Sequence, residues 1–162
     1  MAACVAGAAW AALFVAYPQR DLGRVLLAKI APGDQVIFME NYYFAIPFYA
    51  RLQASAIVVA DWASLEDRRD NWRKELLDAS RFAPEAPSLL AAEALQAEIC
   101  GPAPSWVFGG RGTQASYPLL RDAQQVAASG DTVLWYVPPR TRGTISAMGC
   151  PEMPSANSID KS

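Results

Sequence analysis

The sequence predicts an α/β domain with a small, open and mostly parallel sheet of about four strands, helices on both faces, and an apolar membrane-helix remnant in front. Three observations support this prediction. Short apolar runs have the composition of strands that are buried on both faces. Segments with helical periodicity separate these runs, and no charged residue precedes Arg20. The length of 162 residues fits one domain.

The elements follow from the apolar spacing. The expected strands are short apolar runs at 35–39, 56–60, 106–108 and 132–137. The expected helices have apolar residues at steps of three and four, and they lie at 18–30, 47–52, 61–81, 88–99 and 117–128. The first two strands flank a short helix, so they should be parallel neighbours. The many charges of 61–81 are typical of a solvated helix face.

The opening segment, Met1 to Tyr17, has no charged side chain and lies at the lower edge of the ~17–25 residues that cross a bilayer as a helix. It lacks the basic start of a secretory signal. Trp10 and Tyr17 bracket it, and such rings favour the headgroup layer. We expect the end of a longer membrane helix at 1–17, an α/β domain at 18–150 and a flexible tail at 151–162. An alanine-rich helix buried in a soluble domain is the alternative.

Composition excludes several kinds of function. The net charge of −2 provides no basic face for nucleic acid. The sequence has no histidine, which excludes Ser-His-Asp triads and most transition-metal sites, so we expect no metal and no cofactor. The three cysteines have no metal-ligand spacing. Cys100 and Cys150 both stand beside glycine and proline in predicted turns, where they form either a disulfide or two free thiols.

A polar and aromatic stretch follows the first strand, at the sheet edge where open α/β sheets bind ligands. It predicts a weak binding site for a sugar or a lipid phosphate, with Asp61 joining from the end of the second strand. The residues expected in that stretch are Glu40, Tyr42, Tyr43, Tyr49 and Arg51. The competing interpretation, which we favour, is that Phe44, Phe48 and Tyr49 pack the helix on the sheet.

A glycine-rich segment from Gly110 to Ala115 fits the pattern G-x-G-x-x-A of dinucleotide-binding loops. Gly110 and Gly112 are therefore weak candidates for phosphate contact. However, the segment follows the third strand instead of the first, and the next strand lacks the acid that would hold a ribose. A loop that needs glycine for positive φ is the favoured interpretation.

Three segments carry a family resemblance: PGDQVIFMENYYFAIPFYARL, IVVADW and RDNWRKELLDASRFAP. Together they resemble the carboxy-terminal extracytoplasmic domain of bacterial membrane glycosyltransferases of the protein-O-mannosyltransferase and lipid A aminoarabinose transferase type. The resemblance covers 18–137, and the IPFY element is its most specific part. It implies a polyprenyl-phosphate sugar donor and a periplasmic α/β domain at the inner membrane. The family's catalytic carboxylate lies in an early loop with no counterpart here, so no catalytic residue is assigned.

The resemblance leads to one expected function and two alternatives. The expected function is an accessory domain that is not catalytic alone, whose partners are the membrane, a catalytic membrane part and a lipid-linked sugar. The glycosyltransferase to which the domain would belong transfers the sugar to a lipid A or protein acceptor. One alternative is a soluble nucleotide-binding protein that uses the loop 110–115. The other is an anchored interaction module without a small ligand.

Overall fold

A computed structural model describes residues 18–62, 71–83 and 88–139. The predicted α/β class is confirmed, but the sheet is mixed and has six strands in the order β3-β2-β1-β4-β6-β5. The strands are β1 (Gln35–Met39), β2 (Ile57–Val59), β3 (Ser88–Leu90), β4 (Ser105–Gly110), β5 (Gln124–Ser129) and β6 (Thr132–Val137). The α-helices are α2 (Pro18–Leu27), α3 (Ala45–Ala50), α4 (Trp72–Phe82), α5 (Leu95–Ile99) and α6 (Thr113–Ser116), with short 3-10 turns η2 (Ala92–Ala94) and η3 (Pro118–Leu120).

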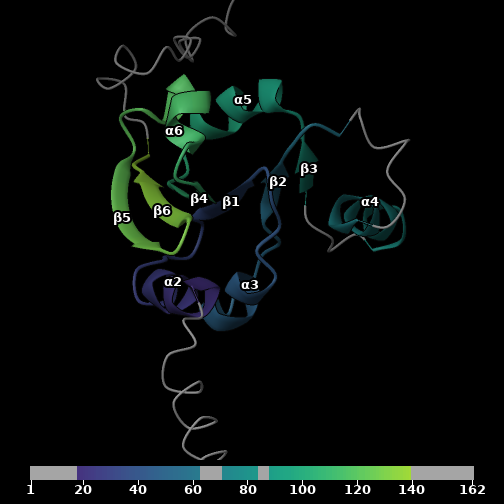
Figure 1. The fold of residues 1–162 in the computed structure, drawn as a ribbon, viewed down its shortest axis with the longest axis horizontal. Helices are drawn as coiled ribbons and strands as arrows, with labels where there is room; N and C mark the ends of the chain where they lie inside the picture. The colour runs from purple at the N-terminus through teal and green to yellow at the C-terminus, as the bar shows by residue number, and fades with distance from the viewer. Residues whose placement is uncertain (1–17, 63–70, 84–87, 140–162) are drawn as a thin grey trace, which may run out of the picture.

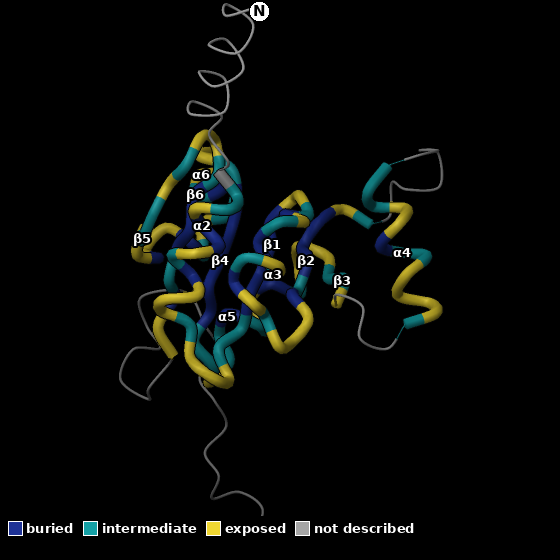
Figure 2. Tube along the Cα trace, turned by 90° about the horizontal axis from the view of Figure 1, so that it is seen from below, coloured by how far each residue is buried: buried dark blue, intermediate teal, exposed yellow. Residues whose placement is uncertain are grey.

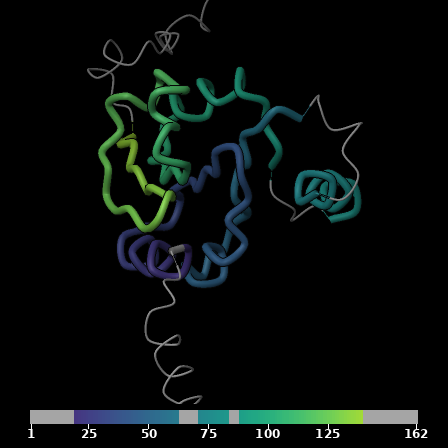
Figure 3. The backbone as a smooth tube through the Cα atoms, in the orientation of Figure 1, coloured from purple at the N-terminus to yellow at the C-terminus, as the bar shows by residue number. Residues whose placement is uncertain are grey.

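The first four strands are parallel, as the βαβ pattern predicts. In the centre, β1 pairs with β2 on one side and with β4 on the other. The chain runs outward from β1 through β2 to β3 and then returns past β1 to add β4, a path that Figure 3 follows by colour. The strand order therefore reverses between β1 and β4.

One predicted helix is right only in its second half, and another is wrong. The segment 88–99 begins with the strand β3 before it turns helical, and 117–128 holds η3 and the strand β5. β5 and β6 form an antiparallel hairpin through Gly130, which adopts φ +59°. Their two-residue connection leaves no room for a parallel crossover, which explains why β5 and β6 are antiparallel. β6 also runs antiparallel to its other neighbour, β4. The prediction of a mostly parallel sheet of about four strands missed this hairpin.

The predicted helices on both faces of the sheet are confirmed. In Figure 1, α2 and α3 lie below the sheet, and α5 and α6 lie above it. Alternate side chains of β1 face the two layers: Phe38 packs in the core with α2 and α3, whereas Ile37 packs with α5. Figure 2 shows that, among the described residues, the strands at the centre are the most deeply buried.

The two ends of the sheet carry different features. We call the end where β1, β2 and β4 finish the carboxyl edge, and the opposite end the amino edge. Gln19 in the first turn of α2 accepts a hydrogen bond from the backbone N–H of Ala45, at 3.1 Å, just after the loop that leaves β1. Leu27 at the other end of α2 lines a groove together with Gln35 at the start of β1. Helix α2 therefore starts at the carboxyl edge and runs back to the amino edge.

Three parts of the sequence prediction lie outside the described residues. They are the apolar segment 1–17, the first half of the charged helix and the tail 151–162. Within the described ranges, no helix has the length and apolarity needed to span a bilayer. The membrane-helix remnant and the three-part division of the chain thus stay predictions.

Candidate functional site at the carboxyl edge

A polar cluster gathers at the point where the strand order reverses. Glu40 follows β1, and one of its carboxylate oxygens accepts a hydrogen bond from the hydroxyl of Tyr117, which ends α6. The other oxygen lies 3.5 Å from the guanidinium of Arg73 in α4. Three elements that are distant in sequence thus meet on one carboxylate, at the edge where open α/β sheets bind ligands.

Local structure fixes each member of this cluster. Glu40 adopts φ +56°, a left-handed conformation that is uncommon outside glycine, and its N–H donates to Val59 of the neighbouring strand at 2.8 Å. Asn71 caps α4 by accepting hydrogen bonds from the N–H groups of Arg73 and Lys74.

Burial raises the pKa of Tyr117 above its ordinary value, and the hydrogen bond to Glu40 and the negative charge of that carboxylate raise it further.

Two tryptophans stand beside the cluster. The rings of Trp62 and Trp72 meet edge to face with centroids 6.2 Å apart, and the indole N–H of Trp62 donates to the carbonyl of Leu90 at 2.8 Å. The guanidinium of Arg73 lies 5.3 Å from the centre of the Trp72 ring and also reaches the carbonyl of Asp61 at 3.5 Å. Arg73 therefore links the ends of β1 and β2.

This arrangement is suited to binding more than to proton abstraction. Both oxygens of Glu40 have a partner, Tyr117 on one and Arg73 on the other, so its charge is already compensated. A polar ligand at this edge would meet a hydroxyl, a guanidinium and a half-exposed carboxylate. Among the described residues, no group of three or more acidic or sulfur side chains could hold a metal ion.

The predicted tyrosines do not join Glu40. Tyr43 is buried, with only 4% of its surface exposed, and its ring packs edge to face on Phe38 at 5.4 Å. Burial raises the pKa of Tyr43 to about 12. Tyr42 also packs on Phe38, at 5.5 Å, and burial raises its pKa. Tyr49 lies where α3 meets α2, because a Cβ on Gly23 would come within 2.8 Å of the Tyr49 Cβ.

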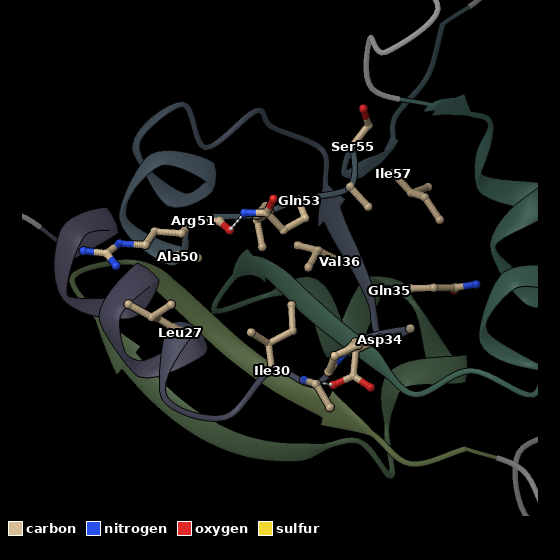
Figure 4. Close-up of a pocket in the computed structure, with 15 residues that line it drawn as sticks. Leu27, Ile30, Asp34, Gln35, Val36, Ala50, Arg51, Gln53, Ser55 and Ile57 are labelled. Atoms are coloured by element: carbon tan, nitrogen blue, oxygen red, sulfur yellow. Dashed lines mark hydrogen bonds between the residues drawn. The ribbon is translucent and has the colours of Figure 1, made fainter.

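Arg51 and Asp61 occupy opposite ends of the sheet. Arg51 caps α3 with φ +52° and lines a groove of about 630 Å³ at the amino edge, together with Leu27, Ile30 and Val36 (Figure 4). Asp61 is exposed after β2 at the carboxyl edge, where its carbonyl meets Arg73. Of the six predicted binding residues, Glu40 and Asp61 share the carboxyl edge, whereas Arg51 is distant from both.

The packing expected of Phe44 and Phe48 is wrong. Phe44 is 58% exposed and Phe48 is 76% exposed. The buried residues of α3 are Ile46 and Ala50, which contact α2 and the sheet instead. The helix is short and turns its phenylalanines away from the sheet, so the aromatic content of the stretch gave a misleading indication of its buried face.

The glycine loop also differs from expectation. Neither Gly110 nor Gly112 has positive φ, and a Cβ at either position would meet nothing within 4 Å. The constrained glycine is Gly109, where a Cβ would lie 2.4 Å from the hydroxyl oxygen of Thr113. Arg111 turns away to donate to the carbonyl of Gly130 at 2.8 Å. The loop lies at the carboxyl edge, and its role in phosphate contact stays a prediction.

Only one cysteine of the predicted pair lies among the described residues. Cys100 follows α5 near the amino edge and is disulfide-bonded. Cys150 lies outside the described residues, so the identity of the pair stays a prediction. Ser105 at the start of β4 pairs with Val137 at the end of β6, which brings the chain segments that lead to both cysteines to the same edge.

Comparison with known proteins points in one direction. The fold resembles part of ArnT. The crystal structure of ArnT from Cupriavidus metallidurans bound to undecaprenyl phosphate superposes with a TM-score of 0.53 at 11% identity, over 82% of this chain and 20% of that one. The apo ArnT structure gives a TM-score of 0.52 at 11% identity, over 75% and 21% of the two chains. No protein-family model and no curated protein matches the sequence.

This similarity establishes a shared fold with a membrane glycosyltransferase, a lipid A aminoarabinose transferase, and it supports the expected resemblance coarsely. The chain spans about one fifth of the length of the ArnT chains. The similarity therefore shows the fold of this chain and not the activity or partners of the whole transferase.

Sequence reasoning missed Tyr117 and Arg73. The sequence predicts Tyr117 at the start of a helix and Arg73 on a solvated helix face. The sequence holds a signal for each of them. Asn71 is a helix N-cap, and it fixes the start of α4, which places Arg73 near the end of β2. Tyr117 follows the glycine loop 110–115 by only two residues, which keeps it at the same edge.

Proposed function

We propose that this chain supplies the membrane-adjacent accessory domain of a polyprenyl-phosphate-dependent glycosyltransferase and is not catalytic alone. The observation that carries the proposal is the fold shared with ArnT over 82% of the chain. The undecaprenyl phosphate in that ArnT structure supports a lipid-linked sugar as the donor. The acceptor is lipid A or a protein, and the folded domain lies on the periplasmic side of the inner membrane.

The direction of α2 supports a role for the carboxyl edge. The apolar sequence 1–17 is followed at once by α2, and the first turn of α2 lies at the carboxyl edge beside Ala45. If the apolar sequence is embedded in lipid, this edge is held next to the bilayer. Glu40 and Tyr117 would then face the membrane-embedded reaction centre and contact the sugar or the phosphate of the donor.

The chemistry of the edge agrees with an accessory role. Glu40 is charge-compensated by Arg73 and hydrogen-bonded by Tyr117, so it orients a polar group more readily than it abstracts a proton. The neighbouring Trp62 and Trp72 rings would add apolar surface for a sugar face. Catalysis would depend on a separate membrane part.

Two measurements test the proposal. The purified chain should show no sugar transfer from a polyprenyl-phosphate sugar, and robust turnover by the chain alone would refute the accessory role. In the native cell, deletion of residues 18–139 should abolish one sugar modification of lipid A or of a protein. Mass spectrometry measures this modification. Unchanged modification after deletion would overturn the proposal, and the variant Lys29→Ala, on the surface away from the carboxyl edge, serves as the matched control.

The nucleotide-binding alternative has less support. The loop 110–115 holds no glycine at positive φ, and the helix that follows has only four residues. If a nucleotide did bind, a concentration of 100 times its Kd would add about 2.7 kcal/mol to stability. A thermal shift with NAD or ATP, lost in Gly112→Val, would favour this alternative over the accessory domain.

A further inference from the structure

Helix α3 and its N-cap residue Phe44 present two large aromatic side chains to their surroundings. Phe44 and Phe48 are 58% and 76% exposed and stand four residues apart, a spacing that places them on the same helix face. Each is supported by a tyrosine: Phe44 meets the Tyr42 ring at 4.6 Å, and Phe48 meets the Tyr49 ring at 5.1 Å. We call Phe44 and Phe48 the aromatic face.

The aromatic face lies beside the point where the apolar sequence joins the domain. The N–H of Ala45, next to Phe44, donates to the side chain of Gln19, and Gln19 is the second residue of α2. No linker separates α2 from the apolar residues that end at Tyr17. Helices α2 and α3 also pack closely, because a Cβ at Gly23 would clash with Tyr49. The position of Phe44 is therefore tied to the end of the apolar sequence.

We infer that the aromatic face docks on the lipid bilayer, with the Phe44 and Phe48 rings at the boundary between headgroups and acyl chains. The inference rests on the membrane attachment in the proposed function. Helix α3 runs from the carboxyl edge at Ala45 toward the amino edge at Arg51, so Phe48 stands one helical turn, about 5.4 Å, behind Phe44. Both rings fit within the depth of about 5–10 Å that interfacial apolar side chains reach.

Phe82 provides a matched control. It is 86% exposed, more than either ring of the aromatic face, but it ends α4, which lies beyond the β3 edge of the sheet in Figure 1. Exposure of a phenylalanine alone would make positions 44, 48 and 82 behave alike. A bilayer that covers only the aromatic face would make them differ.

The experiment places a photoactivatable benzophenone side chain at position 44, 48 or 82 of the full chain. The chain is reconstituted into vesicles of phosphatidylethanolamine and phosphatidylglycerol, irradiated and analysed by mass spectrometry. We expect roughly tenfold more lipid adduct from positions 44 and 48 than from 82, because only those two would lie at acyl-chain depth. Slower amide exchange of α3 in vesicles than in detergent, with α4 unchanged, should accompany it.

Other outcomes overturn the inference. Equal lipid adducts at 48 and 82 would mean non-specific contact. Adducts at 48 with a second copy of the chain, without lipid, would identify the aromatic face as a protein interface. These results are independent of the sugar-modification test: lipid adducts at 44 and 48 with unchanged modification would refute the proposed function alone. Loss of modification without lipid adducts would refute only the docking of the aromatic face.

Discussion

Tyr117 donates its hydroxyl hydrogen to the carboxylate of Glu40 and so ties the loop after β4 to the loop after β1. The two residues are 77 positions apart in the chain. They meet where the strand order reverses, and Arg73 completes the contact from α4. This link makes the carboxyl edge one connected polar surface rather than a set of separate loops.

Removal of the Tyr117 hydroxyl should weaken the domain modestly. We expect Tyr117→Phe to lower the free energy of unfolding by about 1 kcal/mol, because one hydrogen bond to a half-exposed carboxylate is lost. Urea unfolding of the chain in mild detergent measures this change. In a double-mutant cycle with Glu40→Ala, a coupling energy indistinguishable from zero would contradict the link.

A side chain at Gly109 should be poorly tolerated. Gly109→Ala places a Cβ 2.4 Å from the Thr113 hydroxyl oxygen, so we expect a loss of about 1–3 kcal/mol in unfolding free energy. Gly112→Ala is the matched control and should change stability by no more than about 0.5 kcal/mol. Thr113→Ala should recover part of the loss in the Gly109→Ala background. Equal melting temperatures for the two glycine variants would show that the loop is not packed as described.

Stability should fall in alkali because of Tyr43. Its pKa is raised by burial from 10.0 to about 12, so the folded chain holds the phenolic proton more tightly than the unfolded chain does. The resulting stability is fully present below pH 10 and is lost as the pH rises to about 12, by up to about 1.4 kcal/mol for each pH unit. Comparing urea unfolding of the chain and of Tyr43→Phe across this range isolates the effect. Parallel pH profiles would exclude it.

The cysteines can be assigned by alkylation. If Cys100 pairs with Cys150, one of the three cysteines is labelled in the denatured chain without reductant, and all three are labelled after reduction. Peptide mapping should then identify Cys4 as the residue labelled without reductant. Three labelled cysteines without reductant, or a Cys4–Cys100 peptide, would refute the predicted pair.

The centre of the fold was predictable because burial on both faces leaves a plain signature. The apolar runs at 35–39 and 132–137 coincide with β1 and β6, since strands in the middle of a sheet tolerate few polar residues. The edges were not predictable in this way. In β5, exposed and partly buried residues succeed one another irregularly, and β3 has three residues that also fit a helix.

Only some of the predicted site residues come together at the carboxyl edge. Glu40 and Asp61 follow parallel strands directly, so their place is set by strand order alone. Tyr43 and Phe48 show the limit of that reasoning. The sequence places both in one aromatic stretch, and only the path of the loop into α3 decides that Tyr43 is buried and Phe48 is exposed.

Both outer strands of the sheet are poor templates for further pairing. β3 has only three residues, and β5 carries a register shift between Gln125 and Ala127 that interrupts its ladder. A long, flat and uninterrupted edge strand could pair with strands of other molecules and start fibrils. These two interrupted borders therefore disfavour polymerisation of the domain with its own copies at high local concentration.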